Sequence, residues 1–155
     1  LAVYLAWAIL GNDVVVLGGY TIDQALAAVL AGMAAVAGHV WPVFLRFQGG
    51  RGVSVVFGVM LIFCWPAAIS GFLLGLLTLG LSRYVSVASL VVVIMMPVVS
   101  STLFARGSLR LEYLVFSIIG GLLVILWHRD NIQRLISGTE RRLGQKVQMD
   151  GNPTG

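Results

Sequence analysis

Long apolar stretches alternate along this chain with short polar interruptions. A helix needs about 20 apolar residues to cross a hydrocarbon core of about 30 Å. Five stretches approach or exceed that length, and they cover residues 1–17, 22–40, 53–81, 87–104 and 113–127. We therefore predict an all-α protein, a polytopic transmembrane helical bundle.

Two of these stretches contain a visible break. The first is interrupted at Gly11, Asn12 and Asp13, which we place at a membrane boundary, so that residues 1–17 supply a half or a whole span. The third exceeds one span and contains Trp65-Pro66. Because proline ends or kinks a helix, we expect two short crossings here and about six helices in all.

The basic residues assign the two sides of the membrane, because short loops rich in Lys and Arg stay in the cytoplasm. The segment after Trp127 contains Arg129, Arg134, Arg141, Arg142 and Lys146. This places the C-terminus in the cytoplasm. The basic loop at Arg46 and Arg51 shares that side with Arg83 only if the chain crosses twice between them, which agrees with a break at Pro66.

The loop with Arg106 and Arg110 then lies outside, where Glu112 partly compensates its charge.

The chain opens on Leu1 within an apolar run that has neither a basic n-region nor a cleavage pattern, so we expect a fragment that lacks its N-terminal helix. We expect residues 1–147 to form one transmembrane domain and residues 148–155 to form a disordered tail.

Composition excludes a soluble fold. Of the 155 residues, 59% are hydrophobic and 10% are charged, and the mean hydropathy is +0.98. An ordinary soluble domain is about 25% charged, so this chain has too little polar surface to enclose a globular core in water. Its single cysteine, Cys64, excludes a disulfide framework.

The clearest candidate for chemistry is the sequence Gln48-Gly-Gly-Arg-Gly, which comes directly before the apolar stretch that starts at Val53. Glycines let the backbone approach a ligand, and the amides at the start of a helix attract anions. The glycines Gly49, Gly50 and Gly52 with Arg51 therefore predict a phosphate-binding loop, although the loop lacks the Lys and second half of a Walker motif.

Two further polar groups lie at predicted cytoplasmic ends. His128 and Asn131 are three residues apart, so they share a face if one helix continues through them. Ser86 and Ser89 lie one turn apart at the start of a span, where helix-to-helix hydrogen bonds are the ordinary explanation. Two distant histidines without a carboxylate cluster give no metal-ligand spacing, so we expect neither a metal nor another cofactor.

Three segments, taken in order, resemble the bacterial acyl-phosphate glycerol-3-phosphate acyltransferases, the PlsY family. They are GHVWPVFLRFQGGRGV at residues 38–53, SRYVSVAS at residues 82–89 and HRDNIQRLISGTE at residues 128–140. Members are seven-helix proteins of the bacterial inner membrane that act in phospholipid biosynthesis. The resemblance implies transfer of an acyl group from acyl phosphate to the 1-hydroxyl of glycerol 3-phosphate, which gives lysophosphatidic acid.

The resemblance also implies roles for individual residues. The implied catalytic residues are Arg51, Ser89, His128 and Asn131, and the implied phosphate-binding residues are Gly49, Gly50, Gly52, His39 and Ser86. Two departures matter: the family's KGGKG reads QGGRG here, and its first motif, a Ser/Gly/Asn-rich loop after the first helix, is absent from this chain. We therefore expect the fragment by itself to be inactive.

The chemistry suits these residues without a protein nucleophile. Acyl phosphate already carries a good leaving group, so the site must mainly position two phosphates and neutralise their charge.

Membrane lipid is an expected partner and nucleic acid is not. One alternative is a non-catalytic or altered relative, since Arg and Lys differ in geometry. The other is a small transporter or scaffold. A transporter would place polar groups near the bilayer midplane, whereas this chain places them at one face.

Overall fold

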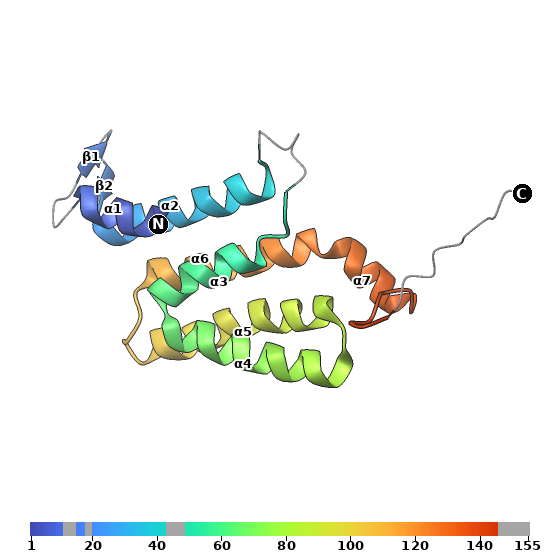
Figure 1. The fold of residues 1–155 in the computed structure, drawn as a ribbon. Helices are drawn as coiled ribbons and strands as arrows, with labels where there is room; N and C mark the ends of the chain where they lie inside the picture. Colours follow the sequence, from blue (N-terminus) through green and yellow to red (C-terminus); the bar gives the residue numbers. More distant parts are fainter. Residues whose placement is uncertain (11–14, 18–19, 43–48, 146–155) are drawn as a thin grey trace, which may run out of the picture.

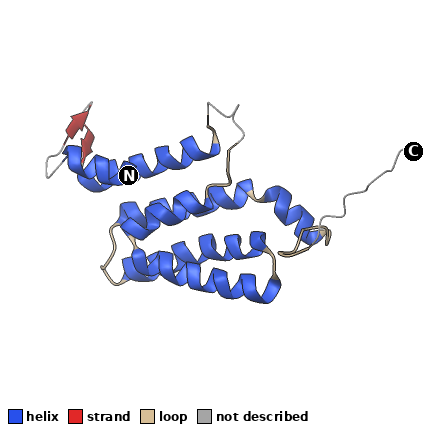
Figure 2. Ribbon diagram, viewed as in Figure 1, coloured by secondary structure: helices blue, strands red, loops and turns tan. Residues whose placement is uncertain are grey.

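The computed structural model describes residues 1–10, 15–17, 20–42 and 49–145. These residues form seven helices and one short β-hairpin (Figures 1 and 2). The predicted helical bundle is confirmed, with the hairpin as an addition. The predicted tail at residues 148–155 and the polar residues Gly11 to Asp13 lie outside the described residues.

The N-terminal part is a helical hairpin closed by two strands. Helix α1 (Ala2–Leu10) packs on helix α2 (Gln24–Val40), and strands β1 (Val15–Leu17) and β2 (Tyr20–Ile22) pair antiparallel between them. Of the two predictions for residues 1–17, the half span agrees with α1, which ends at Leu10, and the whole span is wrong because Val15–Leu17 is a strand. β-Branched residues, which are frequent in both strands, favour extended backbone.

The remaining helices form the main bundle. They are α3 (Val53–Phe63), α4 (Trp65–Ser82), α5 (Val85–Ala105), α6 (Leu111–Trp127) and α7 (Arg129–Ile136). The predicted break near Pro66 is confirmed, because α3 ends at Phe63 and α4 begins at Trp65 with Pro66 in its first turn. Proline is tolerated there since the first helical amides have no partner within the helix.

Small residues let the helices approach closely. On α4, a Cβ added to Gly71 would lie 2.9 Å from the carbonyl oxygen of Val92 on α5, and one added to Gly75 would overlap the Val92 side chain. On α6, a Cβ at Gly121 would lie 3.0 Å from the carbonyl oxygen of Val93. These glycines therefore serve helix packing, as small residues do in membrane proteins.

The helices present apolar side chains outward. Leu73, Leu77 and Leu122 are each more than half exposed, as expected of a surface that faces lipid. By length and composition, α4 and α5 can each cross a membrane, and α6 with α7 gives a third span if this bent pair counts as one. Helix α3 has only 11 residues, about 16 Å, so its expected shortness is confirmed.

Ionisable side chains of the described residues gather at the two ends of the bundle. At one end, Arg110 forms ion pairs with Asp23 and Glu112, as expected for a loop whose charge Glu112 compensates. Asp23 also caps α2, accepting a hydrogen bond from the Leu26 amide at 2.9 Å. This bond and the Arg110 guanidinium lower the pKa of the Asp23 carboxyl. The opposite end, where α2, α4 and α6 finish and α3 and α5 begin, contains the predicted site residues (Figure 1).

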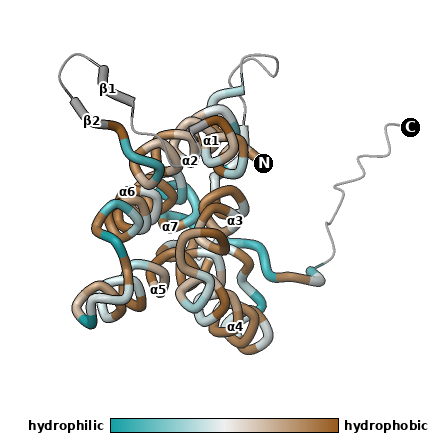
Figure 3. The backbone as a smooth tube through the Cα atoms, turned by 90° about the vertical axis from the view of Figure 1, so that its left-hand side faces the viewer, coloured by the Kyte–Doolittle hydropathy of each residue, from teal (hydrophilic) through white to brown (hydrophobic). Residues whose placement is uncertain are grey.

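Figure 3 views the molecule along the helices. Helices α1 to α6 are mainly hydrophobic, and hydrophilic residues lie in the connections and in α7. Within the described part of the chain, charged side chains thus lie at the ends of the bundle, while the buried polar residues inside α5 and α6 are the uncharged Ser100 and Ser117.

Candidate functional site

The glycine loop closes tightly on the end of α2. The Gly50 amide donates a hydrogen bond to the His39 carbonyl at 3.3 Å. A Cβ at Gly49 would overlap the carbonyl oxygens of His39 and Val40, and a Cβ at Gly50 would overlap the His39 imidazole. Gly49 is required here because its backbone lies directly against the backbone of α2, and Gly50 leaves room for the His39 ring.

Gly52 leads the loop into α3. Its φ of +80° is a left-handed conformation that glycine adopts without strain, and it is the N-cap residue of α3. The buried Gly52 faces Val40, Val124 and Trp127, so the loop is held between α2 and α6. The unpaired amides of the first turn of α3 and the exposed Arg51 therefore lie together at one helix N-terminus, the arrangement that binds phosphate.

His128 lies where α6 ends, and only 2% of its surface is exposed. Its Nδ1 lies 2.8 Å from the Val124 carbonyl oxygen, which orients the ring. Burial lowers the pKa of His128, the bond to Val124 opposes this, and the positive charge of Arg51 lowers the pKa further. Arg51 therefore lies near enough to His128 for its charge to affect that imidazole, although the two residues are 77 positions apart (128 minus 51) in the chain.

The predicted single helix through His128 and Asn131 is wrong. Helix α6 ends at Trp127 and α7 begins at Arg129, with a bend of 57° between them. The apolar α6 follows the bundle, whereas the polar α7 turns along its end. The bend still leaves Asn131 next to this end of the bundle and 96% buried, since its exposed fraction is 4%.

Asn131 belongs to a polar cluster that sequence reasoning missed in part. Its Nδ2 donates to Glu140 at 2.8 Å, and Arg134 binds the same carboxylate at 2.7 Å. Burial raises the pKa of Glu140, but the nearby Ser86 hydroxyl and the bonds from Asn131 and Arg134 outweigh it and lower the pKa to about 2. Glu140 ends the third resembling segment, yet nothing in its spacing revealed this pairing.

The segment after α7 folds back as a strap, residues 137–145, across the turn between α4 and α5. The Leu143 amide donates to the Arg83 carbonyl at 2.7 Å, and Arg142 donates to the Tyr84 hydroxyl at 3.0 Å. The φ of Arg83 is 61°, in the left-handed region that non-glycine residues rarely adopt, and the strap forms its hydrogen bond at this residue. The strap thereby fixes the start of α5, where Ser86 and Ser89 lie.

Two buried polar atoms of the site have no hydrogen-bond partner among the described residues. They are Oγ of Ser86, which lies near the Glu140 carboxylate but without hydrogen-bond geometry, and Oδ1 of Asn131. Buried polar groups are almost always satisfied, so these atoms are candidates for binding a ligand or water.

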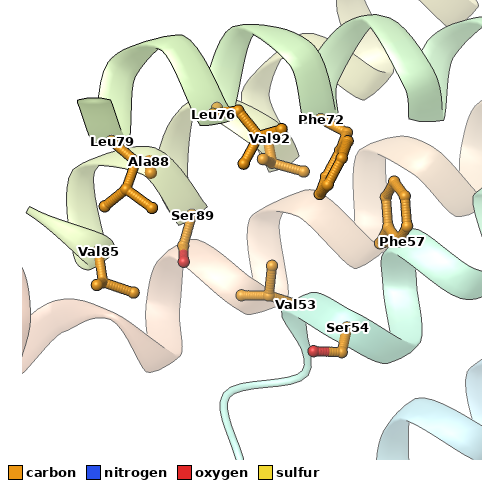
Figure 4. A pocket seen from close by; sticks show the side chains of 11 residues that line it. Val53, Ser54, Phe57, Phe72, Leu76, Leu79, Val85, Ala88, Ser89 and Val92 are labelled. Carbon is orange, nitrogen blue, oxygen red and sulfur yellow. The ribbon is translucent and has the colours of Figure 1, made fainter. Parts of the chain in front are cut away.

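Ser89 lies apart from that cluster, on an apolar groove between α3, α4 and α5 (Figure 4). The groove has a volume of about 240 Å³ and begins directly after the glycine loop. It is lined by Val53, Ser54, Phe57, Phe72, Gly75, Leu76, Leu79, Val85, Ala88, Ser89 and Val92. The structure thus places the glycine loop beside an apolar groove.

Gln48, the first residue of the predicted loop sequence, lies outside the described residues.

These features define a helical membrane-type protein with a glycine loop and a basic residue beside an apolar groove. Comparisons with known proteins give its family. Residues 1–138 match the glycerol-3-phosphate acyltransferase family. Glycerol-3-phosphate acyltransferase 3 of Dehalococcoides mccartyi (strain CBDB1) is 41% identical over 146 residues, which are 94% of this chain and 68% of that protein. The glycerol-3-phosphate acyltransferase of Parasynechococcus marenigrum (strain WH8102) is 42% identical over 77% of this chain and 54% of that protein.

Two solved structures are also similar. The glycerol 3-phosphate form of PlsY (YgiH), an integral membrane glycerol 3-phosphate acyltransferase, has a TM-score of 0.69 and 37% identity over 76% of this chain and 57% of that chain. Its lysophosphatidic acid form has a TM-score of 0.68. The chain therefore belongs to the glycerol-3-phosphate acyltransferase family, and the predicted class of membrane acyltransferase is confirmed. It spans about two thirds of the Dehalococcoides relative and 57% of the solved chain.

Proposed function

We propose that this chain forms the glycerol 3-phosphate site and part of the acyl-donor site of an acyltransferase that uses acyl phosphate. The observation that carries the proposal is the meeting of the glycine loop, Arg51, His128 and Asn131 at one end of the bundle, beside an apolar groove. The relatives' names and the two bound forms of the solved neighbour support this reading.

The proposed reaction needs no covalent enzyme intermediate. The 1-hydroxyl of glycerol 3-phosphate attacks the acyl carbonyl carbon, the new ester bond forms, and the bond to the phosphate oxygen breaks. Inorganic phosphate leaves with the electron pair, and the hydroxyl proton passes to solvent or to phosphate. Catalysis then consists of positioning the two substrates and neutralising their charge.

Each group of residues has its own role in binding and orienting the substrates. Arg51 and the amides around Gly50 and Gly52 hold a phosphate, because a guanidinium binds two phosphate oxygens at once. Ser86 and Asn131 offer buried polar atoms without partners among the described residues, and they orient the substrate oxygens. His128 donates a hydrogen bond to phosphate or transfers the proton.

We further propose that the protein lies in the bacterial inner membrane with this end and the C-terminus in the cytoplasm. The observation in favour is that the basic residues Arg51, Arg83 and Arg129 share one end of the bundle. A transporter is disfavoured, because the ionisable groups of the described residues lie at the ends and none lies midway along a helix.

Sidedness is tested with single cysteines at Ser54, Ala67 and Ser82 in a Cys64→Ala background, labelled from each side of inner-membrane vesicles. We expect cytoplasmic labelling at Ser54 and Ser82 and labelling from the opposite side at Ala67. Ser54 lies in the first turn of α3 and Ser82 ends α4, whereas the far end of the pair is the first turn of α4, where Trp65 is 66% exposed and Ala67 is buried, so Trp65→Cys is labelled alongside Ala67→Cys as the accessible position. Labelling of Ser54 and Ser82 from opposite faces would contradict the arrangement.

The activity is tested in two preparations in lipid nanodiscs. One is this chain, and the other is this chain preceded by the N-terminal segment of the Dehalococcoides relative, hereafter the extended chain. We expect the chain to bind glycerol 3-phosphate in calorimetry, and the extended chain to form lysophosphatidic acid from palmitoyl phosphate and glycerol 3-phosphate. An extended chain that inserts, remains folded and makes no product would overturn the proposal.

A further inference from the structure

The apolar groove ends in a pair of aromatic rings. Phe57 of α3 and Phe72 of α4 face each other with ring centroids 5.4 Å apart and planes inclined by 35°. Figure 4 shows the two rings at one end of the groove, with Val85 and Leu79 at the other end. Phe57 lies four residues after the first residue of α3 (57 minus 53) and Phe72 ten residues before the last residue of α4 (82 minus 72), so the rings form the end of the groove that is deeper in the bundle.

The groove is shorter than a long acyl chain. It follows α4 from Leu79 to Phe72, seven residues at 1.5 Å each, which is about 10 Å. An extended chain advances about 1.2 Å per bond, since three backbone bonds span about 3.6 Å. The groove therefore holds about eight methylenes before the chain reaches the rings.

One side of the groove is open. Phe72 is 42% exposed and Leu76 is 48% exposed, and both belong to the outward face of α4. In a membrane this face meets lipid, so a chain that fills the groove can leave it sideways beside Phe72. The polar atoms of the lining side chains are the hydroxyls of Ser54 and Ser89, which lie near the starts of α3 and α5. This arrangement suits an acyl chain that is attached to a phosphate.

We propose that Phe57 and Phe72 determine which acyl chains the site accepts. The groove binds roughly the first eight methylenes, and the ring pair turns the rest of a longer chain out into the bilayer past Phe72. The occupant is the acyl chain of the acyl phosphate and of the lysophosphatidic acid product. The inference rests on the proposed function, because that function supplies the phosphate-linked chain.

The position of the chain is measured without catalysis. The probes are alkyl phosphates of four to fourteen carbons with a methanethiosulfonate at the far end, which transfers its thioalkyl group to a cysteine thiol. They are applied to the Phe72→Cys variant of the chain in a Cys64→Ala background. We expect labelling to peak at about eight to ten carbons and to fall at least fivefold with excess lysophosphatidic acid. Phe104→Cys, which is 40% exposed on α5 and remote from the groove, serves as the control and should show neither effect.

Chain selection is measured with the extended chain. We expect Phe72→Trp to lower kcat/KM at least tenfold for a sixteen-carbon acyl phosphate and less than twofold for a six-carbon one, because a six-carbon chain ends before the rings. Phe104→Trp should leave the ratio of the two values unchanged. An unchanged ratio in Phe72→Trp, or labelling at Phe72→Cys without a length optimum, overturns the inference. If the extended chain forms no product while the labelling optimum is present, the proposed function fails and the groove assignment stands.

Discussion

Arg51→Ala is expected to abolish acyl transfer by the extended chain. Arg51 is the basic residue of the glycine loop, next to the N-terminus of α3, and truncation leaves a substrate phosphate without its ion partner. Losing one partner of a desolvated, hydrogen-bonded charge pair costs about 2–5 kcal/mol. This corresponds to a fall in kcat/KM between roughly 30-fold and several thousand-fold. Initial rates with palmitoyl phosphate and glycerol 3-phosphate measure it.

Arg51→Lys is the matched control and should retain substantial activity, because the charge is kept and only the two-pronged geometry is lost. A second measurement does not depend on turnover. Since the Arg51 charge lowers the pKa of His128, Arg51→Ala should raise that pKa in an NMR titration of the chain. The chain has two histidines, so His39→Gln identifies the signal. Normal transfer and an unmoved His128 titration in Arg51→Ala would remove Arg51 from the site.

Gly49→Ala is the second change for which we expect a large loss of activity. An added Cβ would overlap the carbonyl oxygens of His39 and Val40 and lie 2.6 Å from Cδ of Pro42. Backbone atoms cannot rotate away as a side chain can, so the loop must move. A displacement of about 1 Å in a positioning site costs about a hundredfold in rate. We expect a loss of at least that size in kcat/KM, with weaker glycerol 3-phosphate binding in calorimetry.

Gly58→Ala provides the control for this substitution. Gly58 lies on α3, and no atom comes within 4 Å of a Cβ added there. Alanine is favoured over glycine in a helix by roughly 1 kcal/mol, so this variant should retain its activity and unfold at the same or a higher temperature. Equal activities of Gly49→Ala and Gly58→Ala would show that the close contact at the end of α2 is not needed for the reaction.

The sequence predicted the architecture well because bilayer physics acts on composition and length. Apolar runs, Pro66 and the basic loops were enough to predict a helical bundle broken between α3 and α4. The hairpin of strands Val15–Leu17 and Tyr20–Ile22 was missed, since a short apolar run fits a helix and a strand equally well. The bend after Trp127 was also missed, because the spacing of His128 and Asn131 satisfies one helix as readily as two.

The sequence alone determined the family and supplied the glycine loop and the polar residues proposed for the site, because these are properties of residue order and spacing. Only the tertiary structure decided which of them meet. Arg51 acts on His128, Asn131 binds Glu140 from the strap, and Ser89 lies on the groove that Phe57 and Phe72 close. These contacts join segments far apart in the chain, and they depend on how closely the small residues of α4, α5 and α6 let the helices pack. The sequence pattern shows which residues share a face of a helix, but it does not give the distances between helices.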